Sequence, residues 1–258
     1  MKIQLLPSTF DSSGYATPEQ RLTCYLIDDC VALDAGSIAL ALNDSQRETV
    51  RDVIITHPHM DHMATLPIYI DDLFGILKEP IRVHATEEII ALLERDVFNW
   101  TVYPRFTELS NEHGPVMQYV PFRVGEEFQV KHLRLIAVPV NHIVPTVGLI
   151  VSDGKATVAF TSDTAATEEF WHTANRTPHI DALFIEASFP NAMADLADVS
   201  GHLTPAALGR ELCKLSHNHL DVLAVHLKPT YRETIVREIE ELALPNLRVM
   251  QPGHNYEW

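Results

Sequence analysis

Four potential metal ligands stand within a stretch of six residues, directly after the apolar run 53–55: His57, His59, Asp61 and His62. In an extended segment alternate side chains point to the same side, which groups His57, His59 and Asp61, and Pro58 disfavours helical conformation at His57. Imidazole and carboxylate groups are good ligands for zinc-like cations. We therefore predict a metal-binding loop in which His57 and His59 hold one ion. A solvated loop that is merely rich in histidine is the alternative.

A helix is expected soon after this loop. Thr65 is a suitable N-cap, and Pro67 is tolerated only in the first turn of a helix. The chain must therefore turn between the strand and the helix, which sets Asp61 and His62 slightly apart from the first pair of ligands. Their position suits a second ion.

Length and composition are those of an ordinary globular protein. The 258 residues are 46% hydrophobic and 21% charged, and they show no composition break or internal repeat, so we expect a single domain over residues 1–258. No apolar run reaches the length of a membrane span, and the first residues lack the apolar region of a signal peptide. A cytoplasmic protein without a membrane partner is the default expectation. The oligomeric state is left open, with a homodimer as one option.

The net charge narrows the choice of partners. A formal charge of −16 opposes long-range attraction to a polyanion, and two divalent cations leave the total strongly negative. We therefore expect no long nucleic acid as a partner. A small anionic substrate is compatible with this charge, because metal ions dominate the electrostatic field inside a pocket.

The sequence alternates between expected strands and expected helices. Strands are expected at 3–6, 22–27, 30–33, 81–84, 133–140, 146–152, 156–161, 182–186 and 222–225. Helices are expected after the caps Thr86 and Thr204 and after a capping box at 230–233. Residues 101–125 follow no clear period and are rich in aromatics, which predicts either a lid over the pocket or a surface excursion anchored by those aromatics.

Polar groups follow several of these apolar runs at their carboxyl ends. The runs 133–140, 156–161 and 222–225 lead to His142, Asp163 and His226, respectively. Strands followed by helices, with ligands collected where the strands end, indicate a layered α/β enzyme whose site lies along one rim of its sheets. Together with the opening motif, these groups are enough for two metal sites.

The full pattern resembles the metallo-β-lactamase superfamily. The HxHxDH run at 57–62, followed by a distant histidine, aspartate and histidine, is typical of that family, and the likeness covers essentially the whole chain, including 33–36. The resemblance implies a four-layer αββα sandwich. It also implies two ligand sets bridged by Asp163: His57, His59 and His142 for one ion, and Asp61, His62 and His226 for the other. A bridging aspartate in place of cysteine argues against antibiotic hydrolysis.

Two further blocks indicate the branch of the family. Residues 186–191 and 201–205, together with 160–164, resemble class II cyclic-nucleotide phosphodiesterases and, more distantly, ribonuclease Z. Met60 stands where that class usually has leucine, and residues 65–67 interrupt its aliphatic run. Within the second block, His202 precedes an expected helix N-terminus, where backbone N–H groups favour an anion such as phosphate. An imidazole there can donate a proton or a hydrogen bond.

These inferences combine into one functional hypothesis. We predict a binuclear metal-dependent phosphodiesterase that opens a 3′,5′-cyclic nucleotide such as cAMP or cGMP by attack of a metal-activated hydroxide. Asp61 fixes an ion and orients the nucleophile, and His202 protonates the leaving oxygen. The expected cofactors are two divalent ions, zinc first, with manganese or iron as alternatives. The rival functions are a lactonase, a thioesterase, a ribonuclease Z-like nuclease, or a noncatalytic metal- or nucleotide-binding protein.

Overall fold

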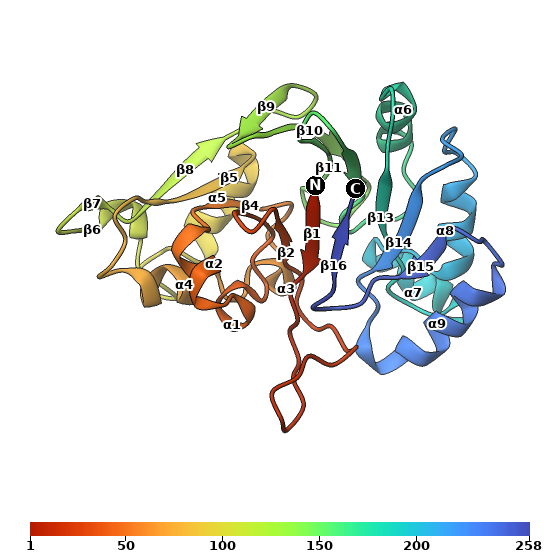
Figure 1. Ribbon diagram of the computed structural model, residues 1–258, viewed down its shortest axis with the longest axis horizontal. Helices are drawn as coiled ribbons and strands as arrows, with labels where there is room; N and C mark the ends of the chain where they lie inside the picture. The colour runs from red at the N-terminus through yellow and green to blue at the C-terminus, as the bar shows by residue number, and fades with distance from the viewer.

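The computed structural model describes residues 1–258 and contains two seven-stranded mixed sheets packed face to face (Figure 1). The first sheet has the strand order β16 (Asn255–Glu257), β1 (Lys2–Leu5), β2 (Tyr25–Ile27), β3 (Val31–Leu33), β4 (Asp52–Ile54), β5 (Ile81–Ala85) and β8 (Met117–Pro121). The second has the order β15 (Leu247–Val249), β14 (Asp221–Val225), β13 (Ala182–Glu186), β12 (Thr157–Phe160), β11 (Val147–Ser152), β10 (Leu133–Pro139) and β9 (Glu127–Val130). Strands β6 (Ser110–Asn111) and β7 (Gly114–Pro115) form a separate small hairpin.

Helices cover the outer face of each sheet. On the first sheet lie α1 (Ile38–Ala41), α2 (Asp44–Thr49), α3 (Met60–Met63), α4 (Leu66–Leu73) and α5 (Glu87–Asp96), and on the second lie α6 (Glu169–Arg176), α7 (Ala194–Ser200), α8 (Pro205–Leu212) and α9 (Arg232–Glu241) (Figure 1). Short 3-10 turns occur at Phe106–Glu108, Asn191–Met193 and Pro229–Tyr231. No helix of the structure has the length and apolar character needed to cross a membrane.

Three separate hydrophobic cores correspond to the three interfaces of this layered arrangement. One lies between α1 to α5 and the first sheet, one between the two sheets, and one between the second sheet and its helices. The core between the sheets includes the stacked rings of Phe160 and Phe184, whose centroids are 4.3 Å apart, and Tyr25 of the first sheet packs against both. The expected αββα sandwich is therefore confirmed.

The strand directions bring the carboxyl ends of several strands to one rim. Strands β3, β4 and β5 run parallel, as do β12, β13 and β14. Strand β10 runs in the direction of β12, because both are antiparallel to β11. The segments that follow β4, β10, β12, β13 and β14 therefore meet at the same edge of the sandwich, as the sequence predicts.

Two of the predicted helix starts are confirmed together with their side-chain caps. The side chains of Thr86 and Thr204 accept hydrogen bonds from the backbone N–H groups of Ile89 and Ala207, which caps α5 and α8. The predicted capping box at 230–233 is wrong. The chain enters α9 through the 3-10 turn that begins at Pro229, so Tyr231 occupies the N-cap position without a side-chain bond.

The region after the histidine motif also differs from the prediction. The extended conformation ends at His59, which is the N-cap of α3, so Asp61 and His62 lie on a one-turn helix and not in an extended segment or an open turn. Alternation along a strand therefore groups His57 with His59 only, and Asp61 is placed by the helical turn. Helix α4 begins at Leu66 with Pro67 in its first turn, as expected, although Thr65 makes no capping bond. The Thr65 hydroxyl instead bonds to Ala35 and Ala39.

Residues 101–125 belong largely to the scaffold. Strand β8 forms the edge of the first sheet beside β5. Phe106 and Phe122 are buried, and Tyr103 and Tyr119 pack against the core that lies below α4 and α5. These contacts account for the aromatic residues without a lid and favour the anchored surface excursion. Only the turn after Phe122 reaches a hollow that adjoins the metal centre described below.

Candidate metal centre

The structure brings the seven predicted ligands together at the rim where the strands end. His57, His59, His142 and Asp163 form one group and Asp61, His62 and His226 form another, and within each group the ligand atoms lie within 4.8 Å of one another. Asp163 joins the two groups, because its carboxylate oxygens lie 3.6 Å from His57 Nε2, 3.4 Å from His62 Nε2 and 3.5 Å from His226 Nδ1. The arrangement is able to hold divalent cations, with Asp163 between the two groups.

Unpaired buried atoms indicate what this centre is built to hold. His57 Nε2, His62 Nε2 and Asp163 Oδ2 are all buried and have no hydrogen-bond partner. Each buried polar atom left without a partner costs about 1–3 kcal/mol, so three of them at one point are unfavourable unless something binds there. A divalent cation is the partner that imidazole nitrogens and a carboxylate oxygen have in common. The residues therefore fit the metal that the motif implies.

The protonation tendencies of the histidines agree with this fit. Burial, together with the neighbouring His62, holds the pKa of His57 well below its ordinary value, and burial beside His142 lowers the pKa of His59. Both shifts favour the neutral ring, which is the form that binds metal. Burial alone would also lower the pKa of His62, but Asp163 and Asp34 reverse this effect and raise it well above its ordinary value. A metal ion bound between these groups would compete with the proton of His62 for the same lone pair on the imidazole.

Asp34 holds His62 from behind. Its carboxylate accepts a 2.7 Å hydrogen bond from His62 Nδ1. It also accepts hydrogen bonds from the backbone N–H and the hydroxyl of Thr56. The Thr56 hydroxyl lies 3.0 Å from His57 Nδ1. The bond fixes the tautomer of His62 so that Nε2 is free for the metal. Asp34 has a positive φ of 60°, a strained conformation that tends to persist at functional sites. Sequence reasoning noted residues 33–36 but assigned this residue no role.

Two glycines permit close approach at the centre. A Cβ on Gly36 would lie 2.1 Å from the backbone oxygen of Asp61, so a side chain there would displace α3. Gly201 has φ of 72°, and its carbonyl accepts a 2.8 Å hydrogen bond from His142 Nδ1. That bond leaves His142 Nε2, which lies 3.1 Å from His59 Nδ1, as the ligand atom.

His202 lies beside the ligands as predicted. Its ring is 5.0 Å from that of His142 and 5.6 Å from that of His226, measured between centroids. His202 Nδ1 bonds to the buried carboxylate of Glu186 at 2.8 Å. Burial by itself lowers the pKa of His202, but the Glu186 carboxylate outweighs burial and raises that pKa above its ordinary value. Glu186 therefore both orients the imidazole and favours its protonated form.

Glu186 connects this imidazole to the rest of the rim. The same carboxylate accepts hydrogen bonds from the backbone N–H groups of Thr164 and Leu203 and from the Ser188 hydroxyl. Ser188 Oγ lies 2.9 Å from His226 Nδ1. The block at 186–188, which suggested the family branch, is thus a hydrogen-bonded support for both His202 and His226.

Lys228 is a functional candidate that sequence reasoning missed. Its ammonium group lies 3.3 Å from Asp61 Oδ2 and is about one third exposed. The position two residues after His226 is the only signal that could have found it. A cation at the mouth of the centre attracts an anionic substrate. In contrast, His254 is exposed and belongs to neither ligand group, and His84 bonds to the buried Asp52 on neighbouring strands.

A family match classifies this centre. Residues 26–229, a span that includes all seven ligand candidates, match the beta-lactamase superfamily domain. The chain belongs to the beta-lactamase superfamily. Membership places it among the metallo-β-lactamase-fold hydrolases, which bind divalent metals, and agrees with the cluster of histidines and aspartates seen here.

Individual relatives within the superfamily are distant. A curated protein of Yersinia pestis described as a probable 3′,5′-cyclic-nucleotide phosphodiesterase is 25% identical over 227 residues, which are 78% of this chain. The match spans only 63% of that relative. Among solved structures, unliganded yeast PDE1 has a TM-score of 0.76 at 18% identity over 98% of both chains. The metallo-β-lactamase fold protein YhfI from Bacillus subtilis has a TM-score of 0.75 at 17% identity over 99% of both chains.

The short form of human tRNase Z is also similar to this chain. Its TM-score is 0.68 at 15% identity, and the comparison covers 100% of this chain and 99% of the human one. At these identities the structural likenesses establish the fold of the chain. They do not by themselves choose among the activities of the superfamily.

The contact between Asp34 and His62 leads to a prediction about metal affinity. Asp34→Asn should weaken metal binding by about 10–100-fold, because partners that orient ligating histidines typically contribute that much. The measurement is a competition titration against a chromophoric zinc chelator. Asp28→Asn is the matched control, since Asp28 also has a positive φ, in the turn between β2 and β3, but accepts a hydrogen bond from the backbone N–H of Lys2 and lies 2.8 Å from His132 Nε2. Equal affinity in Asp34→Asn and the unmodified protein would contradict the role of Asp34.

Proposed function

We propose that this chain is a binuclear metal-dependent phosphodiesterase that hydrolyses a 3′,5′-cyclic nucleotide to the 5′-monophosphate. The observation that carries the proposal is the Glu186–His202 pair beside the ligand cluster. A buried carboxylate that raises the pKa of an imidazole next to a cation centre is suited to a leaving group that departs as an oxyanion. A phosphodiester has such a leaving group.

The seven candidate ligands and His202 have separate roles in this proposal. When bound, the divalent ions supply Lewis-acid stabilisation of negative charge and activate water as a nucleophile near neutral pH. His57, His59 and His142 would hold one ion, Asp61, His62 and His226 the other, and Asp163 both. His202 keeps Nδ1 bonded to Glu186, which leaves the proton on Nε2 for transfer to the departing ribose oxygen. Such proton transfer typically contributes about 10²–10⁴-fold to the rate.

A hollow next to His142 supports a substrate with an apolar part. It has a volume of about 640 Å³, and its lining combines apolar residues such as Phe122, Val124 and Ile143 with polar ones, including His142, Arg123, Glu87 and Glu88. Volumes of roughly 300–1,000 Å³ are usual for small-molecule sites, which are lined mainly by apolar groups with a few polar ones. A nucleobase placed in this hollow leaves its phosphodiester near the metal ligands. The hollow is too small to enclose a long nucleic acid.

Two comparisons support the choice of substrate. The Yersinia pestis relative is described as a probable 3′,5′-cyclic-nucleotide phosphodiesterase, and yeast PDE1 shares the fold over nearly the full chain. The rival supported by a specific comparison is RNA processing of the kind named for human tRNase Z. The net charge of −16 and the absence of a basic arm favour a small phosphodiester over transfer RNA.

A substrate panel tests the proposal. Purified protein loaded with zinc, manganese or iron is assayed with cyclic AMP, cyclic GMP, bis(p-nitrophenyl) phosphate, a lactone, a thioester and a precursor transfer RNA. We expect turnover of a cyclic nucleotide that chelator abolishes and metal restores. Elemental analysis of the purified protein gives the number and identity of the bound ions, for which we propose two zinc ions. Cleavage of the lactone, the thioester or the RNA without cleavage of any cyclic nucleotide would overturn the proposal.

Lys228 provides a further test of substrate charge. Lys228→Ala should raise KM for an anionic phosphodiester about tenfold, because one exposed charge–charge contact contributes up to roughly 1 kcal/mol and somewhat more near a desolvated centre. The turnover number should change little. The control is Arg210→Ala, which removes an exposed cation on α8. A loss confined to kcat, or an equal effect in both variants, would show that Lys228 does not attract the substrate.

A further inference from the structure

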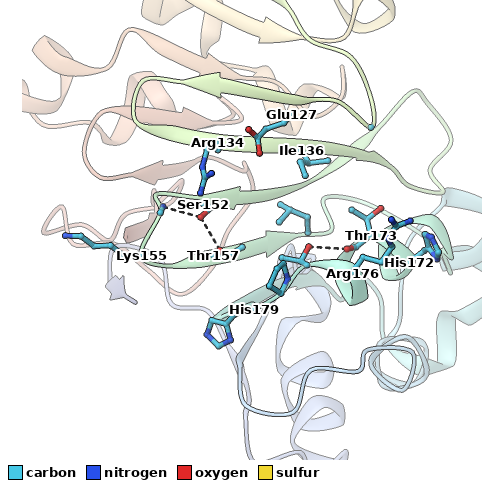
Figure 2. Close-up of a pocket in the computed structure, with 15 residues that line it drawn as sticks. Glu127, Arg134, Ile136, Ser152, Lys155, Thr157, His172, Thr173, Arg176 and His179 are labelled. Atoms are coloured by element: carbon cyan, nitrogen blue, oxygen red, sulfur yellow. Dashed lines mark hydrogen bonds between the residues drawn. The ribbon is translucent and has the colours of Figure 1, made fainter.

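A second hollow lies at the opposite end of the strands from the metal centre. It has a volume of about 700 Å³ and is formed by the outer face of the second sheet, the 153–156 turn and the last turn of α6 (Figure 2). Arg134 stands near the start of β10, whereas His142 follows the end of that strand. Thr157 begins β12, whereas Asp163 follows its end. The two sites are therefore separated by the length of these strands.

The floor of this hollow is set by strand register. Arg134, Ser152 and Thr157 stand opposite one another on β10, β11 and β12, so their side chains form one row on the outer face. The next outward row contains Ile136 and Ile150. Figure 2 shows Arg134 directed toward Ser152, whose hydroxyl lies 3.1 Å from the hydroxyl of Thr157. The floor thus joins a polar row to an apolar one.

Three cations around this hollow have no partners. Fourteen of the 19 Lys and Arg side chains bond or pair with a carboxylate or a carbonyl oxygen. Of the five that do not, Arg134, Lys155 and Arg176 line this hollow, whereas Lys78 and Arg210 lie elsewhere. They come from β10, from the turn before β12 and from the end of α6, so local sequence does not group them. Glu127 is the one carboxylate among the lining residues. In a chain of net charge −16, these three exposed side chains form a local excess of positive charge.

We propose that this hollow is a second binding site, separate from the metal centre, for a phosphorylated small molecule. The planar guanidinium groups of Arg134 and Arg176 present several N–H donors in a geometry that matches phosphate oxygens, and Lys155 adds a mobile charge at the rim. The row containing Ile136 and Ile150 takes the uncharged part of the ligand. The volume lies within the range of about 300–1,000 Å³ usual for small-molecule sites.

The test is an NMR titration of the metal-loaded protein with inorganic phosphate and with phenyl phosphate. Binding at this site is read from the amide signals of Gly154, Lys155 and Thr157, and binding at the metal centre from those near His142 and Asp163. We expect saturable shifts at both groups of signals, and we expect phenyl phosphate to bind the hollow more tightly than phosphate because its ring covers the isoleucines.

Matched variants connect these shifts to the three cations. The triple variant Arg134→Ala, Lys155→Ala, Arg176→Ala should lose at least about tenfold in affinity at the hollow while its signals near the metal centre respond as before. Arg210→Ala, which removes an exposed cation on α8, should bind as the unmodified protein does. Should the triple variant fold poorly, the three single variants replace it, each with a smaller loss.

Three outcomes would overturn the proposal. The first is a response to both phosphates only near the metal centre. The second is unchanged affinity at the hollow when its cations are removed. The third is that a hexaglutamate peptide shifts the Gly154 and Thr157 signals at lower concentration than phenyl phosphate does. That result would identify the hollow as a docking site for an acidic peptide and not for a small molecule.

Discussion

Asp163→Ala is expected to abolish activity and to remove both metal ions. Asp163 is buried, and its two carboxylate oxygens lie within 3.6 Å of nitrogens from His57, His62 and His226. Without it, the two ligand groups lose their only common member and the negative charge that offsets two cations. Turnover should fall by at least about 10³-fold, because the ions supply most of the charge stabilisation in this kind of catalysis. Elemental analysis and turnover measured on the same sample check this.

The control for this variant is Asp198→Ala. Asp198 is an exposed residue of α7, shortly before His202 in the sequence, and it belongs to neither ligand group. The Asp198→Ala variant should retain full metal content and full turnover. A second variant, Asp163→Asn, keeps the side-chain volume and separates loss of charge from loss of packing. If Asp163→Ala retained two ions per chain, the proposed bridging role would be wrong, although the superfamily assignment would stand.

His202→Ala is expected to lower turnover by about 10²–10⁴-fold while metal content stays unchanged. The reason is that His202 hydrogen-bonds to Glu186 on one side and leaves its other nitrogen for the substrate. The effect should be largest for substrates with poor leaving groups. It should nearly vanish for bis(p-nitrophenyl) phosphate, whose leaving group departs without protonation. Comparison of kcat for the two kinds of substrate is therefore the decisive measurement.

The metal content of the variant distinguishes proton transfer by His202 from a second role, metal ligation. His202 also lies with Asp163 and His226 in a third group whose ligand atoms are within 4.8 Å of one another, so it could in principle ligate an ion. Loss of metal in His202→Ala would identify it as a ligand and remove it from proton transfer. His219→Ala is the control, since His219 is an exposed histidine without a bond to any neighbour. Near-normal turnover in His202→Ala would contradict both roles.

Local sequence was sufficient for the main strands and for the polar groups at their ends, whereas the four-layer sandwich was expected from the family resemblance. Strand β13 spans 182–186 as predicted, and β12 differs from its prediction by one residue at each end. These strands are apolar along their length and are bounded by polar residues, so their ends are marked in the chain itself. His142, Asp163 and His226 could be found for the same reason, since each follows closely after such a strand.

The features that were missed depend on contacts between distant segments. Asp34 is separated from His62 by 28 residues, and nothing near residue 34 shows that its carboxylate will meet that imidazole. Lys228 becomes relevant only because β14 ends opposite α3, which places its ammonium group beside Asp61. The helical turn at Met60–Met63 is likewise set by packing, since Ala35 N–H bonds to the carbonyl of His62 and Thr23 N–H to that of Asp61.

The two sheets contribute unequal parts of one centre. His57, His59, Asp61 and His62 follow β4 of the first sheet, whereas His142, Asp163 and His226 follow strands of the second. Any ion that binds both sets therefore cross-links the halves of the sandwich and favours their docked arrangement over any separated one. By mass action, free metal at 100 times its dissociation constant adds about 2.7 kcal/mol to the stability of the folded chain. Metal supply would thus govern the lifetime of the protein as well as its chemistry.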